Sequence, residues 1–162
     1  MRLPVFPNWY PYNDMLLDGH LKVGEFGVKT RSYDWKYRGA VLLYTSGRTQ
    51  QSCVQAYNYA KGTDKHNLII GVANLVDVRL LNDAEIRKMV CNFNNLTVRE
   101  VKPDLSNVAV VPFPFGYFFS NIRRFDKPIP FSWPSGPVKP IMTDVRSGSR
   151  LRQQVLAAGI NS

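Results

Sequence analysis

Residues 68–78, LIIGVANLVDV, decide the fold that the sequence predicts. The run is apolar almost throughout, and its length is that of a buried strand. Gly71 interrupts it near the start, and a glycine inside a strand indicates a β-bulge or the close approach of another backbone. A second apolar run of strand length lies upstream at residues 37–44, YRGAVLLY. We therefore expect a sheet with these two buried strands in its interior.

Capping and turn residues predict short helices and further strands around this sheet. The expected helices span residues 12–18 with Gly19 as the stop, residues 50–60 between Thr49 and Gly62, a segment that begins at Asn82 with Glu85 as capping-box partner, and part of residues 146–158 behind Ser147 or Ser149. Further strands are expected at residues 108–111, 115–121 and 129–131. Many short strands with a few inserted helices predict an α+β fold, a small β-barrel with helices over its ends.

Length and composition indicate one globular domain. The chain has 162 residues, of which 44% are hydrophobic and 20% are charged. We expect the barrel domain to occupy residues 1–142, followed by a basic C-terminal tail or short helix at residues 143–162. No signal-peptide pattern and no long apolar run is present, which predicts a cytoplasmic protein without a membrane segment.

The cysteine and histidine residues lack the spacing of a metal site. Cys53 and Cys91 do not form a CxxC motif, and His20 and His66 are separate from each other and from any cysteine pair. We expect no bound metal and no cofactor. The cysteines are expected to be buried, reduced thiols.

The net charge of +9 is the strongest global feature. Excess positive charge on a small domain attracts phosphate groups through Coulomb forces and counterion release. The charge therefore favours nucleic acid or a phosphorylated, nucleotide-like ligand as partner. Solubility alone is the alternative explanation.

Four stretches resemble the ASCH domain family. Residues 10–19 (YPYNDMLLDG) are similar to its opening helix, residues 30–39 (TRSYDWKYRG) to its Thr-Arg-Ser-Trp segment, residues 69–73 (IIGVA) to a glycine-containing strand, and residues 115–130 (FGYFFSNIRRFDKPIP) to its aromatic strand, Asn-x-Arg-Arg turn and closing strand. The resemblance spans about residues 3–141, with the stretches in the family's order.

The resemblance implies an ASCH-like, PUA-like β-barrel with a cleft beside the first helix. Members are generally thought to bind RNA, and some are reported as hydrolases of N4-acylated cytidine or as ribonucleases. The family signature runs Gly-x-Lys-x-x-Glu-x-Arg, with Thr in place of Glu in the amidohydrolase branch. Gly19 and Arg31 match its two ends across a longer loop, and Lys29 stands at the acidic position. Lys22 would then be the signature lysine and Glu25 the acid.

Basic and aromatic residues interleave between residues 29 and 38 and form the candidate nucleic-acid site. The basic members, opposed only by Asp34, are expected to contact phosphate, and alternate aromatic residues to stack on bases. The candidate contacts are Lys29, Arg31, Tyr33, Trp35, Lys36 and Arg38, with Arg123 and Arg124 as a second basic cluster. Arg31 is the leading candidate because its planar fork can hold a phosphate in two hydrogen bonds. The alternatives are a solvated basic edge and aromatic side chains that face the core.

A hydrolase of this fold would need a nucleophile or activated water, and a base to take its proton. The candidate catalytic residues are Lys29, Thr30, Lys22 and Glu25, with Thr30 as nucleophile, a lysine of lowered pKa as base, and Glu25 or Glu85 as relay. Three functions stay open from sequence alone. The preferred one is an RNA- or nucleotide-binding module; the others are a small hydrolase of the same fold and a basic protein-interaction module.

Overall fold

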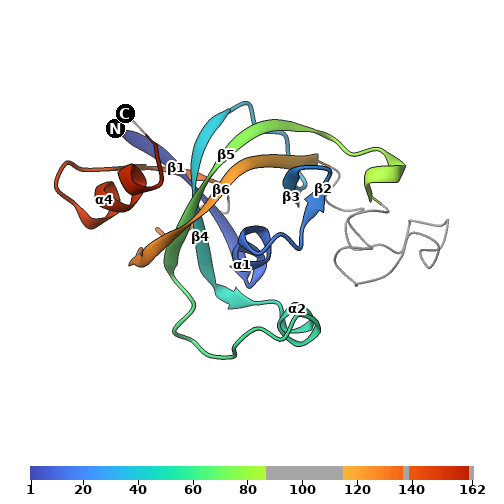
Figure 1. Cartoon of the computed structure of the whole chain (residues 1–162), viewed down its shortest axis with the longest axis horizontal. Helices are drawn as coiled ribbons and strands as arrows, with labels where there is room; N and C mark the ends of the chain where they lie inside the picture. Colours follow the sequence, from blue (N-terminus) through green and yellow to red (C-terminus); the bar gives the residue numbers. More distant parts are fainter. Residues whose placement is uncertain (87–114, 137–138, 161–162) are drawn as a thin grey trace.

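The computed structural model describes residues 1–86, 115–136 and 139–160 (Figure 1). Within these residues, one seven-stranded mixed sheet runs in the order β2-β3-β6-β5-β4-β1-β7. Its strands are β1 (Arg2–Tyr10), β2 (Lys22–Val23), β3 (Phe26–Arg31), β4 (Gly39–Thr49), β5 (Leu68–Leu80), β6 (Phe115–Pro130) and β7 (Ile141–Asp144). The described helices are α1 (Tyr12–Leu17), α2 (Gln51–Ala56) and α4 (Arg150–Ala157). The predicted α+β class is confirmed.

The sheet curls strongly but does not close (Figure 1). Its outer strands are β2 and β7, and in the part of the chain that the structure describes these two are not paired with each other. The sequence predicted a small β-barrel with helices over its ends. In the structure the described strands form a curled sheet that is open between β2 and β7. A two-residue strand such as β2 offers too few backbone groups for a ladder across the gap.

The central strand β5 pairs with β4 on one side and with β6 on the other. Its register against β6 shifts between Ile69 and Gly71. A Cβ atom on Gly71 would lie 2.4 Å from the backbone oxygen of Arg123. The prediction that this glycine marks a bulge and a close backbone approach is confirmed.

Strand β1 was not predicted, although it lies inside the sheet. It pairs in parallel with β4 and antiparallel with β7. Pro4 and Pro7 fall within it, and a proline removes a backbone donor from the ladder. Burial outweighs this loss, because Val5 and Phe6 are fully buried.

Other elements differ in length from the sequence expectations. Strand β6 is one continuous element, where two shorter strands were expected, and α2 is shorter than residues 50–60. Thr49 ends β4 and contacts His66, with 2.7 Å between Oγ1 and Nε2, so it does not cap α2. The capping box of Asn82 and Glu85 is present, with backbone-to-side-chain hydrogen bonds of 3.1 and 2.9 Å. The expected strand at residues 108–111 and Cys91 lie outside the described residues.

Alternate residues of the inner strands pack into two hydrophobic clusters, one on each face of the sheet. Phe6 and Leu43 belong to the cluster that α1 covers, whereas Leu42 belongs to the one that receives Val155 of α4. The helix α4 is capped by Ser149, whose Oγ accepts a hydrogen bond from the Arg152 amide. The C-terminal segment therefore packs against the sheet. No helix in residues 1–86, 115–136 and 139–160 is long and apolar enough to cross a membrane.

We expect Gly71→Ala to destabilise the domain by about 1–3 kcal/mol, since the new Cβ would overlap backbone atoms of β6 that cannot rotate away. Urea unfolding followed by far-ultraviolet circular dichroism measures the change. Gly47→Ala is the matched control on β4, because the nearest atoms there belong to the Asn67 side chain at 3.7 Å or more. Equal stability of the two variants would contradict the close approach.

Candidate functional site

Strand β3 points alternate side chains to opposite faces of the sheet. On one face, a Cβ at Gly27 would lie 3.2 Å from Leu16 of α1, and the Lys29 amine lies over the ring of Tyr12. On the other face, Val28 packs in a small cluster with Phe118. Lys29 and Arg31 therefore share the face that α1 covers. Thr30 points the opposite way, so the structure separates it from Lys29.

The Arg31 guanidinium is bound by acceptors of the domain itself. Its Nη1 donates to the backbone oxygen of Thr30 at 2.9 Å, and its Nη2 donates to the Pro7 oxygen and to Asn8 Oδ1. Its Cζ lies 4.4 Å from the centre of the Phe6 ring. The fork expected to hold a phosphate thus ties β3 to β1. Arg31 presents a fixed positive charge with few donors left over.

Asn8 extends this contact into a chain of buried hydrogen bonds. Its Nδ2 donates to Asn13 Oδ1 at 2.7 Å, and Asn13 Nδ2 donates to Thr45 Oγ1 at 3.3 Å. Asn8, Asn13 and Thr45 are all buried. The chain links β3, β1, α1 and β4, so the position of Arg31 is set by four elements.

Lys29 lies beside Arg31, and no hydrogen bond joins its amine to a residue in the part of the chain that the structure describes. Its Nζ is 3.4 Å from the centre of the Tyr12 ring, a cation–π distance. Burial, and then the charge of Arg31, lower the pKa of Lys29 to about 7, while the nearby Cys53 opposes this shift. Among the residues that the structure describes, no carboxylate shifts the pKa of either cation. Near neutral pH, Lys29 is therefore present in comparable amounts as ammonium and as free amine.

Aromatic side chains surround these two cations. Tyr33 packs edge-on against Tyr117 at 6.1 Å, and the Tyr117 hydroxyl donates to the Tyr33 backbone oxygen at 2.7 Å. The exposed Lys139 places its Nζ 4.9 Å from the centre of the Tyr33 ring. Phe6 and Tyr117 are buried, whereas Tyr12, Tyr33 and the two cations are half-buried. We call the set Phe6, Tyr12, Lys29, Arg31, Tyr33 and Tyr117 the half-buried cation cluster, with Lys139 at its edge.

The aromatic residues of the 33–37 segment pack inward. Trp35 stacks on Tyr37 at 5.1 Å between ring centres, and both contact the cluster of buried residues that contains Phe6. The segment is irregular rather than a strand, yet its aromatic and charged residues still alternate between half-buried and exposed. Stacking on bases would therefore use ring surface that the packing leaves open.

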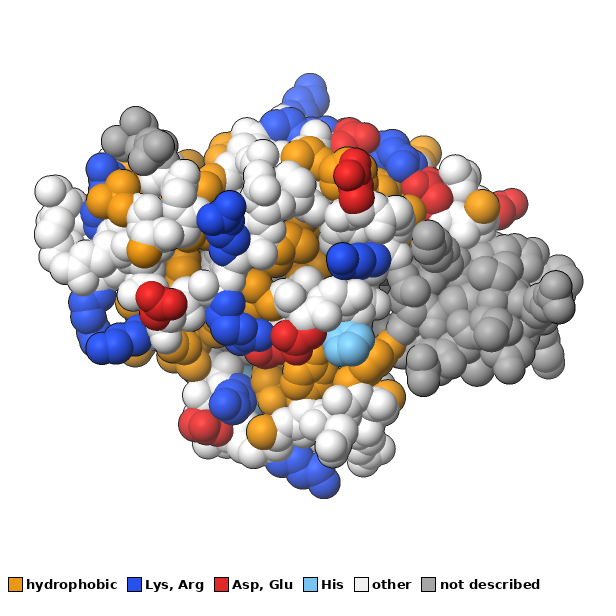
Figure 2. Space-filling model, in the orientation of Figure 1, with side chains coloured by type: hydrophobic (Ala, Val, Ile, Leu, Met, Phe, Trp, Pro, Cys, Tyr) orange, Lys and Arg blue, Asp and Glu red, His pale blue; other side chains and the backbone are white. Residues whose placement is uncertain are grey.

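The other expected basic contacts lie outside the half-buried cation cluster. Lys36 and Arg38 are exposed, and Arg38 is bound to the Trp35 and Tyr37 oxygens at 2.6 and 2.8 Å. Arg123 is exposed on β6. Arg124 pairs with α1 acids, 2.9 Å from Asp14 and 3.6 Å from Asp18. Lysine and arginine side chains are spread over the face shown in Figure 2 rather than gathered in one patch.

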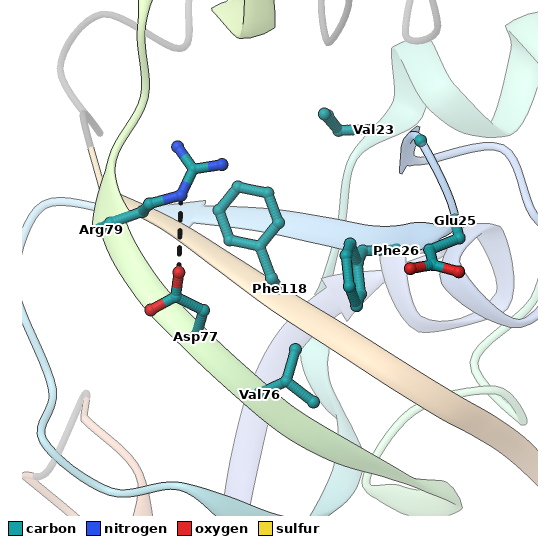
Figure 3. Close-up of a pocket in the computed structure, with 8 residues that line it drawn as sticks. Val23, Glu25, Phe26, Val76, Asp77, Arg79 and Phe118 are labelled. Carbon is teal, nitrogen blue, oxygen red and sulfur yellow. Dashed lines mark ion pairs between the residues drawn. The ribbon is translucent and has the colours of Figure 1, made fainter.

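The remaining catalytic candidates lie at the β2–β3 hairpin. Lys22 and Glu25 are exposed. Glu25 lines a separate pocket of about 650 Å³ with Phe26, Phe118, Asp77 and Arg79 (Figure 3). Phe118 packs with Val28, so this pocket is on the face of β3 that Lys29 does not occupy. The alternative relay, Glu85, is held by Arg79 in two hydrogen bonds of 2.6 Å.

Sequence reasoning missed several residues of the site. Asn8 and Asn13 are polar residues in an otherwise apolar N-terminal stretch, a pattern that indicates buried hydrogen bonding. The Tyr12 hydroxyl contacts the Cys53 thiol, and burial raises the pKa of both groups. Nothing in the local sequence of Lys139 indicates that it lies over Tyr33.

Comparison with known proteins gives similarity of fold only. No family model matches the sequence, and no curated protein matches it. The chain is similar to the crystal structure of an ASCH protein from Zymomonas mobilis, with a TM-score of 0.46 and 10% identity over 95% of this chain and 93% of that one. Two single-residue variants of that protein give TM-scores of 0.47 and 0.45 at 10% identity, again over 95% of this chain and over 94% and 96% of theirs. All three are structures of this ASCH protein.

We expect Lys29 to make stability depend on pH. Its pKa is lowered on folding, so above about pH 7 the unfolded chain binds the additional proton and stability rises with pH. Below pH 7 both states are protonated, and the cost of burying the charge is fully present. Lys29→Met should therefore stabilise the domain most at pH 6 and reduce the slope between pH 7 and 9, by up to about 1.4 kcal/mol per pH unit.

Urea unfolding of both proteins across this pH range measures the difference. Lys65→Met, at an exposed lysine, controls for loss of a surface charge. Parallel curves for the wild type and Lys29→Met would contradict a buried Lys29 of lowered pKa.

Proposed function

We propose that the domain binds RNA, another single-stranded nucleic acid or a nucleotide at the half-buried cation cluster. One observation carries the proposal: Lys29 and Arg31 lie two residues apart on the same face of β3, both half-buried among aromatic rings, and among the described residues no carboxylate shifts their pKa. A buried charge is normally paired, because its desolvation is otherwise uncompensated. An anionic ligand would provide the missing counter-charge.

The roles of the residues follow from their contacts. Arg31 is held by Pro7, Asn8 and Thr30, so it supplies a fixed positive potential. Within residues 1–86, 115–136 and 139–160, Lys29 has its ring contact and the neighbouring charges, which leaves its donors for a phosphate oxygen. Lys139 over Tyr33 extends the positive potential to the exposed edge.

Outside the cluster, Lys36, Arg38 and Arg123 would add weaker contacts along a longer strand. The net charge of +9, spread over the surface, supports attraction of nucleic acid without sequence preference. Location in the cytoplasm belongs to the same proposal.

We expect Lys29→Gln and Lys139→Gln each to weaken binding of labelled single-stranded RNA by about 3- to 30-fold at fixed salt, the range for losing one charge-assisted contact. Each should also lower the salt slope of the binding constant by about one. Fluorescence anisotropy titrations of RNA and DNA of mixed sequence give both quantities.

Lys65→Gln is the matched control, since it removes one exposed charge from a loop. If it weakens binding as much as Lys29→Gln, bulk charge alone drives association. Absence of binding by the wild type would leave the basic protein-interaction module as the better explanation.

The pKa of Lys29 favours a second candidate, a hydrolase. A free amine near neutral pH is a suitable general base. Thr30 lies on the opposite face of β3, so the nucleophile would be water, whose proton Lys29 takes. In an N4-acylated cytidine, the water oxygen would form a bond to the acyl carbon and the bond from that carbon to N4 would break. In RNA, the same base would promote cleavage of a phosphodiester.

Turnover of either substrate should rise with pH along a limb centred near 7, since only the free amine acts as base. Overnight incubation with N4-acetylcytidine, followed by chromatography, and with labelled RNA, followed by a denaturing gel, measures it. Lys29→Gln should abolish turnover, and Lys65→Gln should retain it. Turnover that survives in Lys29→Gln would exclude this candidate.

A further inference from the structure

We propose that Lys29 forms a covalent imine with the aldehyde of a nucleic acid from which a base has been lost. The inference rests on the proposed function, because binding of the strand's phosphates brings the aldehyde to the half-buried cation cluster. It goes beyond binding by assigning Lys29 the role of a nucleophile.

The first support is the environment of the amine. Among the described residues, the contacts of Lys29 Nζ are the Tyr12 ring at 3.4 Å and the charges of Arg31 and Cys53. An ammonium group has three donors and is normally hydrogen-bonded when buried. No carboxylate of the described residues acts on Lys29, so none of these residues keeps the amine protonated.

The second support is the fixed charge next to it. Arg31 is bound to three acceptors on β1 and β3 and cannot turn away from Lys29. A permanent cation beside a lysine in apolar surroundings disfavours a second positive charge, a known way in which proteins produce a nucleophilic amine. Burial lowers the pKa of Lys29 in the same direction.

The chemistry needs only the amine and an aldehyde. The nitrogen lone pair of the neutral Lys29 amine forms a bond to the aldehyde carbon, and the electron pair of the carbonyl moves to oxygen. The resulting carbinolamine then loses one molecule of water, made of that oxygen and the two protons of the amine. A C=N bond remains. No oxidant or reductant takes part, and one water is released for each imine.

Loss of a base is the step that gives a nucleic-acid sugar a free aldehyde, through opening of its ring. The strand keeps its phosphates on both sides of that sugar. Arg31 acts electrostatically on Tyr33, and Lys139 Nζ lies 4.9 Å from the centre of the Tyr33 ring, so both cations are near enough to this ring to attract such charges. Loss of the base also leaves a gap in the stack. Tyr12 and Tyr33 can offer aromatic surface there, where stacking on a neighbouring base contributes about 1–3 kcal/mol.

The test traps the imine by reduction. The full chain is incubated at neutral pH with a labelled single-stranded oligonucleotide that carries one abasic site, and sodium borohydride is added. An oligonucleotide with a tetrahydrofuran in place of that sugar has no aldehyde and serves as the substrate control. We expect a protein–DNA adduct that survives a denaturing gel, only with the aldehyde-bearing strand, and peptide mass spectrometry should place it on Lys29.

Variants separate this amine from the others in the chain. Lys29→Gln and Lys29→Arg should reduce the adduct by about tenfold or more, since neither offers a free amine at that place, and Lys65→Arg should leave it unchanged. Circular dichroism confirms that each variant is folded. An adduct on the Met1 amine or spread over exposed lysines would overturn the inference, and mapping of the wild-type adduct decides this even if a Lys29 variant does not fold.

Binding of the tetrahydrofuran strand, measured by anisotropy, separates failure of the inference from failure of the proposed function. Saturable binding without an adduct would overturn the inference and leave the binding function intact. If neither the tetrahydrofuran strand nor RNA binds, the proposed function fails and the inference fails with it.

Discussion

The arrangement of the site depends on the hydrogen bonds of the half-buried Arg31 guanidinium. They join β3 to Pro7 and Asn8 of β1, two strands that the sheet order places far apart. Asn8 passes the contact on to Asn13 and Thr45. Removing one partner from such a buried chain leaves a desolvated polar group, at a cost of about 1–3 kcal/mol. The chain therefore holds the curled sheet in the one register that brings β3, β1, α1 and β4 together.

Burial is the main cause of the lowered pKa of Lys29, and the charge of Arg31 that these contacts hold in place adds to it. A cation held by neutral acceptors keeps its full charge, whereas an ion pair with a carboxylate would cancel most of it. Lys29, two residues away on the same face of β3, experiences that charge in surroundings that already disfavour ionisation. The hydrogen bonds of Arg31 thus join strands β3 and β1, and together with burial the charge of Arg31 lowers the pKa of Lys29 to about 7. Binding of an anion would reverse the second effect, since a negative charge favours the ammonium form.

Local signals predicted the elements whose causes are local. The close approach at Gly71 depends on the absence of a Cβ at that one position. The capping box of Asn82 and Glu85 lies within four consecutive residues, and Ser149 caps the helix that directly follows it. Strand β1 was missed because Pro4 and Pro7 weaken the strand pattern, and the burial that overrides them depends on β4 and β7.

The site was predicted only in part, for a similar reason. Lys29 and Arg31 were among the candidates because basic residues gather there in the sequence. Lys29 and Arg31 are separated from Thr30 because side chains alternate along a strand. This can be inferred only when it is known that these three residues belong to strand β3, which begins at Phe26. The engagement of Arg31 by Asn8, 23 positions away, and the contact of Lys139 with Tyr33 depend on the tertiary fold.

The distribution of the described acids is consistent with a preference of the proposed site for anions. In the described part of the chain, the ion pairs formed by carboxylates involve partly exposed arginines, as in Arg2 with Asp144, Arg79 with Glu85 and Arg124 with Asp14. Exposed pairs of this kind contribute little stability. A carboxylate beside Lys29 would instead satisfy the buried charge and, in doing so, would keep the amine protonated and repel a phosphate. In the proposed function the net charge of +9 would attract nucleic acid to the whole surface. The half-buried position, with no carboxylate of the described residues acting on it, is what distinguishes Lys29 from the other lysines that the structure describes.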